Sequence, residues 1–154
     1  MNGRRRNRGF TLVELMITLV LATLLLSLGV PAYNDHVERA STSKAIGDIL
    51  TLSLAIDSFR LRNNDRVPDT LAELGIPIPT DPWGRPYQFL NIIDGKPNKG
   101  DVRKDGALNP LNSDFDLYSL GKDGLSKKPL NAKHARDDIV RANNGAFVGR
   151  AEDY

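Results

Sequence analysis

The chain has 154 residues and a formal net charge of +2, which suits one small domain with an additional terminal segment. It contains no cysteine, which excludes disulfides, thiol catalysis and thiolate zinc sites, and its two histidines, His36 and His134, lie far apart in the sequence. No zinc-protease, serine-nucleophile or phosphate-loop motif is present, so we expect a protein that is not an enzyme.

The positive charge is concentrated at the N-terminus. Residues 1–9 hold four arginines, and removing them would lower Lys+Arg from 21 to 17 against 19 Asp+Glu, leaving a net charge of about −2. The basic character therefore belongs to the first residues and gives no reason to expect a nucleic acid as a partner.

An apolar segment follows from Phe10 to Val30, and it contains one carboxylate, Glu14. The segment is long enough to cross a bilayer as a helix, with the preceding arginines on the cytoplasmic side. A charged side chain within such a helix is costly, so the presence of Glu14 requires a reason. A cleaved secretory signal would need a small-x-small site after the apolar run, which is weak here, and a plain membrane anchor would not explain Glu14.

The hydroxyl groups in this segment are expected to bond back to helix carbonyls, which makes them tolerable there; they are Thr11, Thr18, Thr23 and Ser27. Pro31 lacks a backbone donor, so it should kink or locally melt the helix. Beyond Tyr33 apolar residues recur at helical spacing, at Ile46, Ile49, Leu52, Ile56 and Phe59. We therefore predict one helix from near Phe10 to about Asn63, whose second half packs this stripe on a small head.

The rest of the chain predicts short elements joined by loops. The first is a helix over 67–75, with Thr70 or Asp69 expected as its cap and Gly75 as its stop. After it, in chain order, come a turn over 81–86, a strand over 87–92, a loop over 93–113, a strand over 115–120 and short edge segments at 138–140 and 146–148. The expected fold class is α+β, with a long N-terminal helix packed on a small antiparallel sheet and a C-terminal loop.

The sequence from Gly9 to Glu14, Gly-Phe-Thr-Leu-Val-Glu, resembles the class III signal of type IV pilins and type II secretion pseudopilins. The resemblance implies that a prepilin peptidase cuts between Gly9 and Phe10 and that the new Phe10 amine is methylated. It also implies that Glu14 meets the N-terminal amine of a neighbouring subunit during assembly, and that the helix can unwind near Pro31 in the polymer. The implied domains are a leader over 1–9, a hydrophobic transmembrane and fibre-core helix over 10–32, and a periplasmic head over 33–154.

Two later motifs narrow the resemblance. Asp-Pro-Trp-Gly-Arg-Pro-Tyr at 81–87 and Asp-Leu-Tyr-Ser-Leu-Gly-Lys-Asp-Gly at 116–124 are similar to the turn and the strand with its loop in major pseudopilins of type II secretion, the GspG family. Taken in order with the leader, they extend the resemblance over most of the chain. The implied fold is type IV pilin-like.

In that family the C-terminal loop binds calcium, a cation that takes carboxylate and carbonyl oxygens. The resemblance implies the Leu120 carbonyl and the carboxylates of Asp123, Asp137 and Asp138 as ligands, and a bound ion would help to order a loop with little apolar surface. Residues 124–136 form an insertion whose cations could pair with the aspartates instead; they are Lys127, Lys128, Lys133, His134 and Arg136. A third possibility for residues 120–138 is a charged loop exposed to solvent, with neither calcium nor ion pairs.

The resemblance implies a major pseudopilin subunit that polymerises into a short periplasmic fibre driving protein secretion across the outer membrane. Before assembly it would lie in inner-membrane lipid with its C-terminal head in the periplasm. The implied partners are other copies of the chain, the prepilin peptidase, minor pseudopilins and the inner-membrane assembly platform. The alternative is a type IV pilin for adhesion, motility or DNA uptake, or a subunit of another pilin-like fibre, although major pilins usually carry a C-terminal disulfide loop that this chain lacks. A minor tip pseudopilin would often lack or alter Glu14.

Overall fold

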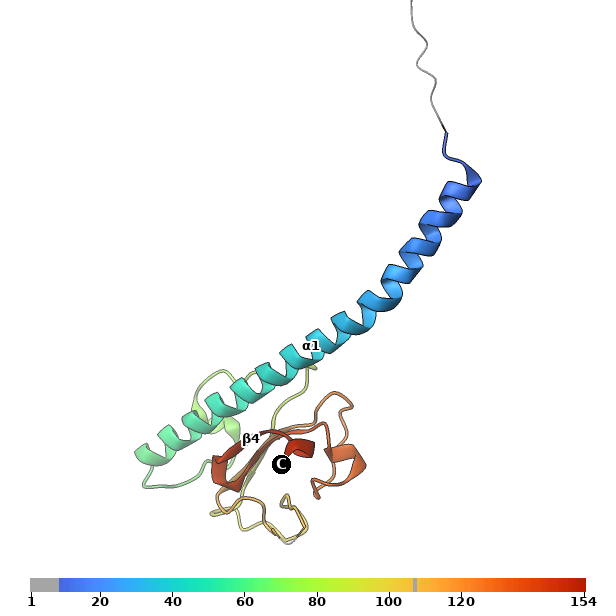
Figure 1. Cartoon of the computed structure of the whole chain (residues 1–154). Coiled ribbons are helices and arrows are strands. Elements are labelled where there is room, and N and C mark those ends of the chain that lie inside the picture. Colours follow the sequence, from blue (N-terminus) through green and yellow to red (C-terminus); the bar gives the residue numbers. More distant parts are fainter. Residues whose placement is uncertain (1–8, 107) are drawn as a thin grey trace, which may run out of the picture. The chain divides into compact units, whose positions relative to one another are not determined.

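The computed structural model describes residues 9–106 and 108–154, and its order of elements is shown in Figure 1. Helix α1 spans Leu12–Arg62. It is followed by four strands, β1 (Gln88–Asn91), β2 (Phe115–Ser119), β3 (Ile139–Ala142) and β4 (Phe147–Arg150). Short 3₁₀ turns lie between or after these elements, namely η1 (Leu71–Leu74), η2 (Lys133–Ala135), η3 (Asn143–Gly145) and η4 (Ala151–Asp153). The chain divides into two compact units, one ending at Arg39 and the other formed by Ala40–Tyr154.

The first unit contains the apolar part of α1 and the more polar turns that follow it as far as Arg39. Helical structure continues without interruption through Pro31, where a kink or local melting was expected. The hydroxyls of Thr18 and Ser27 donate to the carbonyls of Leu15 and Leu24, at 2.9 and 2.7 Å, and Thr23 makes similar bonds, so these predictions are confirmed. An 18-residue window of this helix has a mean hydropathy of 2.3 and no buried residue, so by length and composition it could cross a membrane.

In the second unit, the C-terminal half of α1 contributes its apolar stripe to the core. Ile49, Leu52, Ile56 and Phe59 are buried as predicted, whereas Ile46 is only partly buried and Ala45 takes the fully buried position beside it. The stripe shares one hydrophobic cluster with residues of the sheet, including Phe115, Leu117 and Ile139. Burying a Leu, Ile or Phe side chain contributes about 1.5–3 kcal/mol, so this cluster is the main reason for the helix to pack on the head.

The sheet is antiparallel, with its strands in the order β1-β2-β3-β4. The strands predicted over 87–92 and 115–120 are confirmed as β1 and β2. The segments predicted as short edges are longer than expected, and β3 lies in the interior of the sheet with partners on both sides, so its edge assignment was wrong. All four residues of β3 are buried, including the charged residue Arg141. This burial is consistent with the central place of β3 in the sheet.

The predicted helix over 67–75 is reduced to the single 3₁₀ turn η1. Thr70 precedes it in an extended conformation without a side-chain cap, and the Glu73 carboxylate instead accepts the backbone N–H of Asp69 at 3.0 Å. Gly75 ends the turn with a φ of 67°, as its position in the sequence predicted. The observed fold is therefore α+β, a long N-terminal helix and a small antiparallel sheet, as expected.

Candidate functional site

The first candidate site is the start of α1. Gly9 and Phe10 precede the helix, and the Phe10 side chain is 74% exposed. The backbone N–H of Glu14 donates to the Thr11 hydroxyl oxygen at 3.3 Å, so Thr11 is the N-cap of the helix and Glu14 occupies its first turn. Together these four residues line one open hollow.

The hydrogen bond at this N-cap differs from what the sequence predicted for Thr11 and adds a role for Glu14. The Thr11 hydroxyl accepts a hydrogen bond at the helix start, whereas it was expected to bond back to a carbonyl. The Thr-x-x-Glu pattern, visible in the sequence, is typical of a helix start, and a first-turn carboxylate is stabilised by the positive end of the helix dipole. Glu14 therefore has a local structural role that sequence reasoning missed, beside the assembly role implied by the resemblance.

The second candidate site joins the two motifs that narrowed the resemblance. The side chain of Asp81 is 3% exposed, and its Oδ1 accepts the backbone N–H groups of Trp83 and Arg85 at 3.1 and 2.7 Å. Its other oxygen, Oδ2, accepts the hydroxyl of Ser119 at 2.6 Å. A single buried carboxylate thus shapes the turn before β1 and attaches it to the end of β2.

Arg85 makes a further connection between these motifs. Its guanidinium donates to the carbonyl oxygens of Gly121 and Lys122 at 3.1 and 2.9 Å. Gly124 has a φ of +71°, and a Cβ added there would lie 2.5 Å from Arg85 Nη1, so a glycine at this position permits both the turn and the approach of the guanidinium.

Two of the residues predicted as calcium ligands are adjacent in the structure. The backbone N–H of Asp123 donates to Asp137 Oδ2 at 2.9 Å, and Asp123 Oδ1 accepts the backbone N–H of Leu125 at 2.7 Å. The second oxygen of Asp123 lies 3.5 Å from Nδ1 of His134, one of the cations in the insertion. Leu120 is nearby in the sequence, at the start of this loop.

Asp138 is engaged differently. Its carboxylate is fully buried, and Oδ2 accepts Arg103 Nη2 at 2.6 Å and the hydroxyl of Ser126. Burial raises the pKa of Asp138 to about 6, against the opposing effects of Arg103 and Ser126, which favour the ionised form. The cation beside Asp138 therefore comes from the loop between β1 and β2, outside the insertion.

Among the residues that the structure describes, no three His, Asp or Glu side chains converge in a geometry that could hold a metal. Asp123 and Asp137 already accept backbone N–H groups, and Asp138 is paired with a guanidinium. As arranged, these side chains do not converge on one metal position, although Asp138 Oδ1 is buried without a hydrogen-bond partner among the described residues, and the binding of calcium remains a prediction from the sequence. Arg103 was missed because it lies in a polar loop, and no sequence pattern distinguishes a buried arginine from a solvated one.

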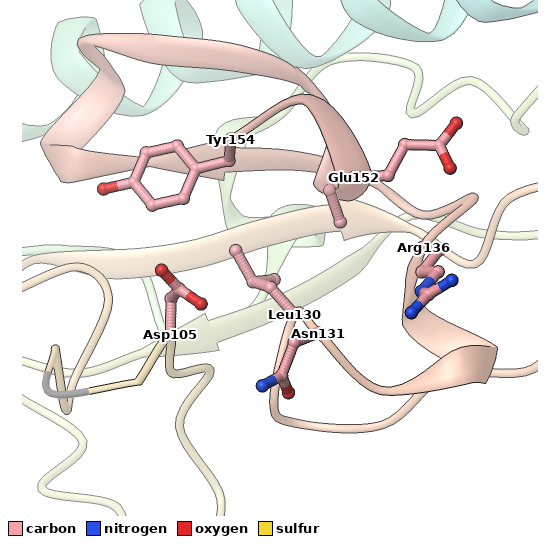
Figure 2. A pocket seen from close by; sticks show the side chains of 7 residues that line it. Asp105, Leu130, Asn131, Arg136, Glu152 and Tyr154 are labelled. Carbon is pink, nitrogen blue, oxygen red and sulfur yellow. The ribbon is translucent and has the colours of Figure 1, made fainter.

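A third feature is an open hollow of about 390 Å³ near the C-terminus, with both polar and apolar lining residues, shown in Figure 2. Asp105 and Tyr154 lie toward one end of it and Arg136 and Glu152 toward the other, with Leu130 between them. Arg136, one of the insertion cations, thus belongs to the lining of this hollow. Both signs of charge are present, so the hollow does not favour a strongly charged ligand of either sign.

Comparison with known proteins gives two findings. Residues 4–30 match the family described as the prokaryotic N-terminal methylation motif, and this range includes the four N-terminal arginines and the apolar part of α1 up to Val30. The chain is also similar to proteins named type II secretion system core protein G. It is 34% identical over 143 residues to that of Pectobacterium carotovorum subsp. carotovorum, covering 78% of this chain and 79% of the relative.

The similarity recurs in other species. The core protein G of Pseudomonas aeruginosa is 33% identical over 142 residues, covering 79% of this chain and 87% of the relative. The core protein G of Aeromonas hydrophila is 34% identical over 144 residues, covering 79% of this chain and 87% of the relative. These relatives align with this chain over most of its length. This chain therefore belongs to the type II secretion system core protein G family.

Proposed function

We propose that this chain is a major pseudopilin, a non-enzymatic subunit that polymerises into a short periplasmic fibre and drives type II secretion across the outer membrane. The observation that carries the proposal is the apolar half of α1, which has no buried residue in the structure although its side chains are among the most hydrophobic of the chain. Such a surface needs lipid or other subunits to cover it. A fibre in which each helix is covered by its neighbours meets that requirement.

Processing would prepare the chain for this assembly. The prepilin peptidase would cut between Gly9 and Phe10, and the new Phe10 amine would be methylated while the head faces the periplasm. Phe10 and Glu14 lie at the same exposed end of α1, where the carboxylate can neutralise the amine of an adjacent subunit. Removing either partner of an ion pair in a low-dielectric environment is strongly unfavourable, so the pair would set the register between subunits.

The proposal is tested by replacing Glu14 with alanine in the full chain. We expect Glu14→Ala to insert in the inner membrane at normal levels, while fibre assembly, measured as cross-linked multimers of the chain in intact cells, and secretion of folded substrates are lost. Thr18→Ala is the matched control, because Thr18 is also an exposed polar residue of the same helix. Normal fibre yield from Glu14→Ala would contradict the proposal.

The alternative, a type IV pilin for adhesion, motility or DNA uptake, shares the same N-terminal segment. The Asp81 and Ser119 motifs and the relatives named for type II secretion favour the pseudopilin. Long surface pili made from this chain at native expression, with secretion unaffected by its deletion, would favour the alternative. The partners of the fibre, namely minor pseudopilins and the inner-membrane assembly platform, follow from the proposed role.

A further inference from the structure

The buried carboxylate of Asp138 immediately precedes β3, the strand at the interior of the sheet. It is fully buried, and the energetic cost of burying an ionised carboxylate is several kcal/mol unless a partner compensates it. The segment that carries Asp138 also closes the C-terminal loop, because Asp137 Oδ2 accepts the backbone N–H of Asp123. Whatever neutralises Asp138 therefore fixes both the loop and the strand.

Arg103 provides that neutralisation through Nη1 and Nη2, whereas its Nε and the second oxygen of Asp138, Oδ1, are buried without a hydrogen-bond partner among the described residues. Its side chain is 1% exposed; Nη2 donates to Asp138 at 2.6 Å and Nη1 donates to the Ser126 hydroxyl at 2.9 Å. The Ser126 hydroxyl in turn donates to Asp138, which completes a triangle of hydrogen bonds. The guanidinium also lies 4.2 Å from the centre of the Tyr118 ring, a distance typical of a favourable cation–π contact.

The backbone of Arg103 is anchored as firmly as its side chain. Its N–H donates to the buried carboxylate of Asp116 in β2 at 2.8 Å, and its carbonyl accepts the N–H of Leu111 at 2.8 Å. The guanidinium is thus held by contacts to β2, to the C-terminal loop and to the residue before β3. An arginine fixed in this way does not lose much additional entropy when it pairs with Asp138.

A second arginine acts on the same loop from another segment. Arg85 donates to the carbonyl oxygens of Gly121 and Lys122, in the turn that leads to Asp123. Carbonyl and carboxylate oxygens are the ligands that a hard cation such as calcium takes. In this head, two carbonyl oxygens of the loop and one carboxylate oxygen of Asp138 accept hydrogen bonds from guanidinium groups.

We propose that Arg103, assisted by Arg85, supplies the positive charge that orders the C-terminal loop, so that the head of this chain folds without calcium. An ion that bound Asp138 would have to displace the guanidinium or approach a like charge in a buried environment, and both are unfavourable. This inference concerns the stability of the head and is independent of whether the chain polymerises.

The direct test is thermal unfolding of the full chain in detergent, followed by the fluorescence of its one tryptophan, Trp83, which packs against the core of the head. We expect the same midpoint in excess calcium and in a calcium chelator, and no calcium binding by isothermal titration calorimetry. A required ion at 100 times its Kd would raise the midpoint by about 10 °C. A calcium-dependent rise of that size in the unmodified chain would overturn the proposal.

A set of variants tests the role of Arg103 itself. Arg103→Met should lower the midpoint by about 10 °C or more in both solutions, because it leaves Asp138 buried and unpaired. Adding Asp138→Asn should recover part of that loss. Arg150→Met is the matched control, since Arg150 pairs with Glu152 at a partly exposed position. If Arg103→Met is no less stable than this control, the proposal is wrong. If Arg103→Met does not fold, the calcium titration of the unmodified chain still tests whether the head requires calcium.

Discussion

The hydroxyl of Ser119 donates a 2.6 Å hydrogen bond to the carboxylate of Asp81, and both groups are buried. The two residues are 38 positions apart, in a turn before β1 and at the end of β2. The same hydroxyl oxygen accepts the backbone N–H of Gly121, so the contact continues into the C-terminal loop. The sequence motifs at 81–87 and 116–124 thus form one structural unit in this chain.

Removing the Ser119 hydroxyl should destabilise the head. Ser119→Ala leaves one oxygen of Asp81 and the N–H of Gly121 without their partner, and an unsatisfied buried polar group costs about 1–3 kcal/mol. The measurement is the free energy of unfolding in urea. Ser58→Ala is the control, because the Ser58 hydroxyl is exposed and bonds only within α1. Equal stability of the two variants would show that the contact contributes little.

Gly124 and Arg85 provide a prediction about crowding. Gly124→Ala should be destabilised more than Gly84→Ala, because both glycines have positive φ, but only at Gly124 would the new Cβ meet the Arg85 guanidinium. The strain alone costs about 1 kcal/mol, and the excess at Gly124 comes from losing the bonds of Arg85 to the loop carbonyls. The comparison uses urea unfolding of both variants.

A double-mutant cycle identifies the source of that excess. In an Arg85→Met background the difference between Gly124→Ala and Gly84→Ala should disappear, because the guanidinium no longer occupies the space. A difference that persists in this background would mean that another group near Gly124 resists the methyl group.

The Asp114–Arg141 pair predicts a pH dependence. Burial alone would raise the pKa of Asp114, but hydrogen bonds from Arg141 and from the Phe115 N–H outweigh it and hold the pKa below its usual value. The two side chains form a bidentate pair at 2.8 and 2.7 Å. Because the unfolded chain takes up the proton first as the pH falls, the stabilisation is complete above the usual pKa near 3.9 and is lost as the pH falls through the lower folded value.

Asp114→Asn should therefore be less stable than the unmodified chain at pH 7, and the gap between their midpoints should narrow on acidification toward pH 3. Asp116 and Asp138, whose pKa values are raised, affect both chains alike and cancel in the difference. Asp65→Asn is the control, because Asp65 pairs with Arg60 at an exposed position. A gap that stays constant from pH 7 to pH 3 would contradict the assignment.

The sequence predicted those parts of the fold that depend on periodicity and on turn residues. The stripe from Ile49 to Phe59 repeats at helical spacing and is buried, and Gly75 ends its turn as expected. It did not predict the central place of β3, because Arg141 interrupts its apolar residues and charged side chains are ordinarily exposed.

The candidate site was predictable to a similar extent. The N-terminal segment and the motif that contains Asp81 could be recognised from local sequence. The pairing of Arg103 with Asp138 joins residues 35 positions apart, and local sequence contains no information about which cation reaches a given carboxylate. This is why the sequence indicated cations of the insertion near Asp138, whereas the structure places Arg103 there.

The last prediction separates the two roles of Glu14. Thr11→Ala removes the N-cap acceptor for the Glu14 N–H but leaves the Glu14 carboxylate in place. An N-cap contributes about 0.5–2 kcal/mol, which is small for a helix that lipid or neighbouring subunits would cover. Thr11→Ala should therefore assemble fibres at close to the normal yield, measured by cross-linking in intact cells and immunoblotting, whereas Glu14→Gln should not, because it removes only the charge. If both variants fail equally, the capped helix start rather than the Glu14 charge is what assembly requires.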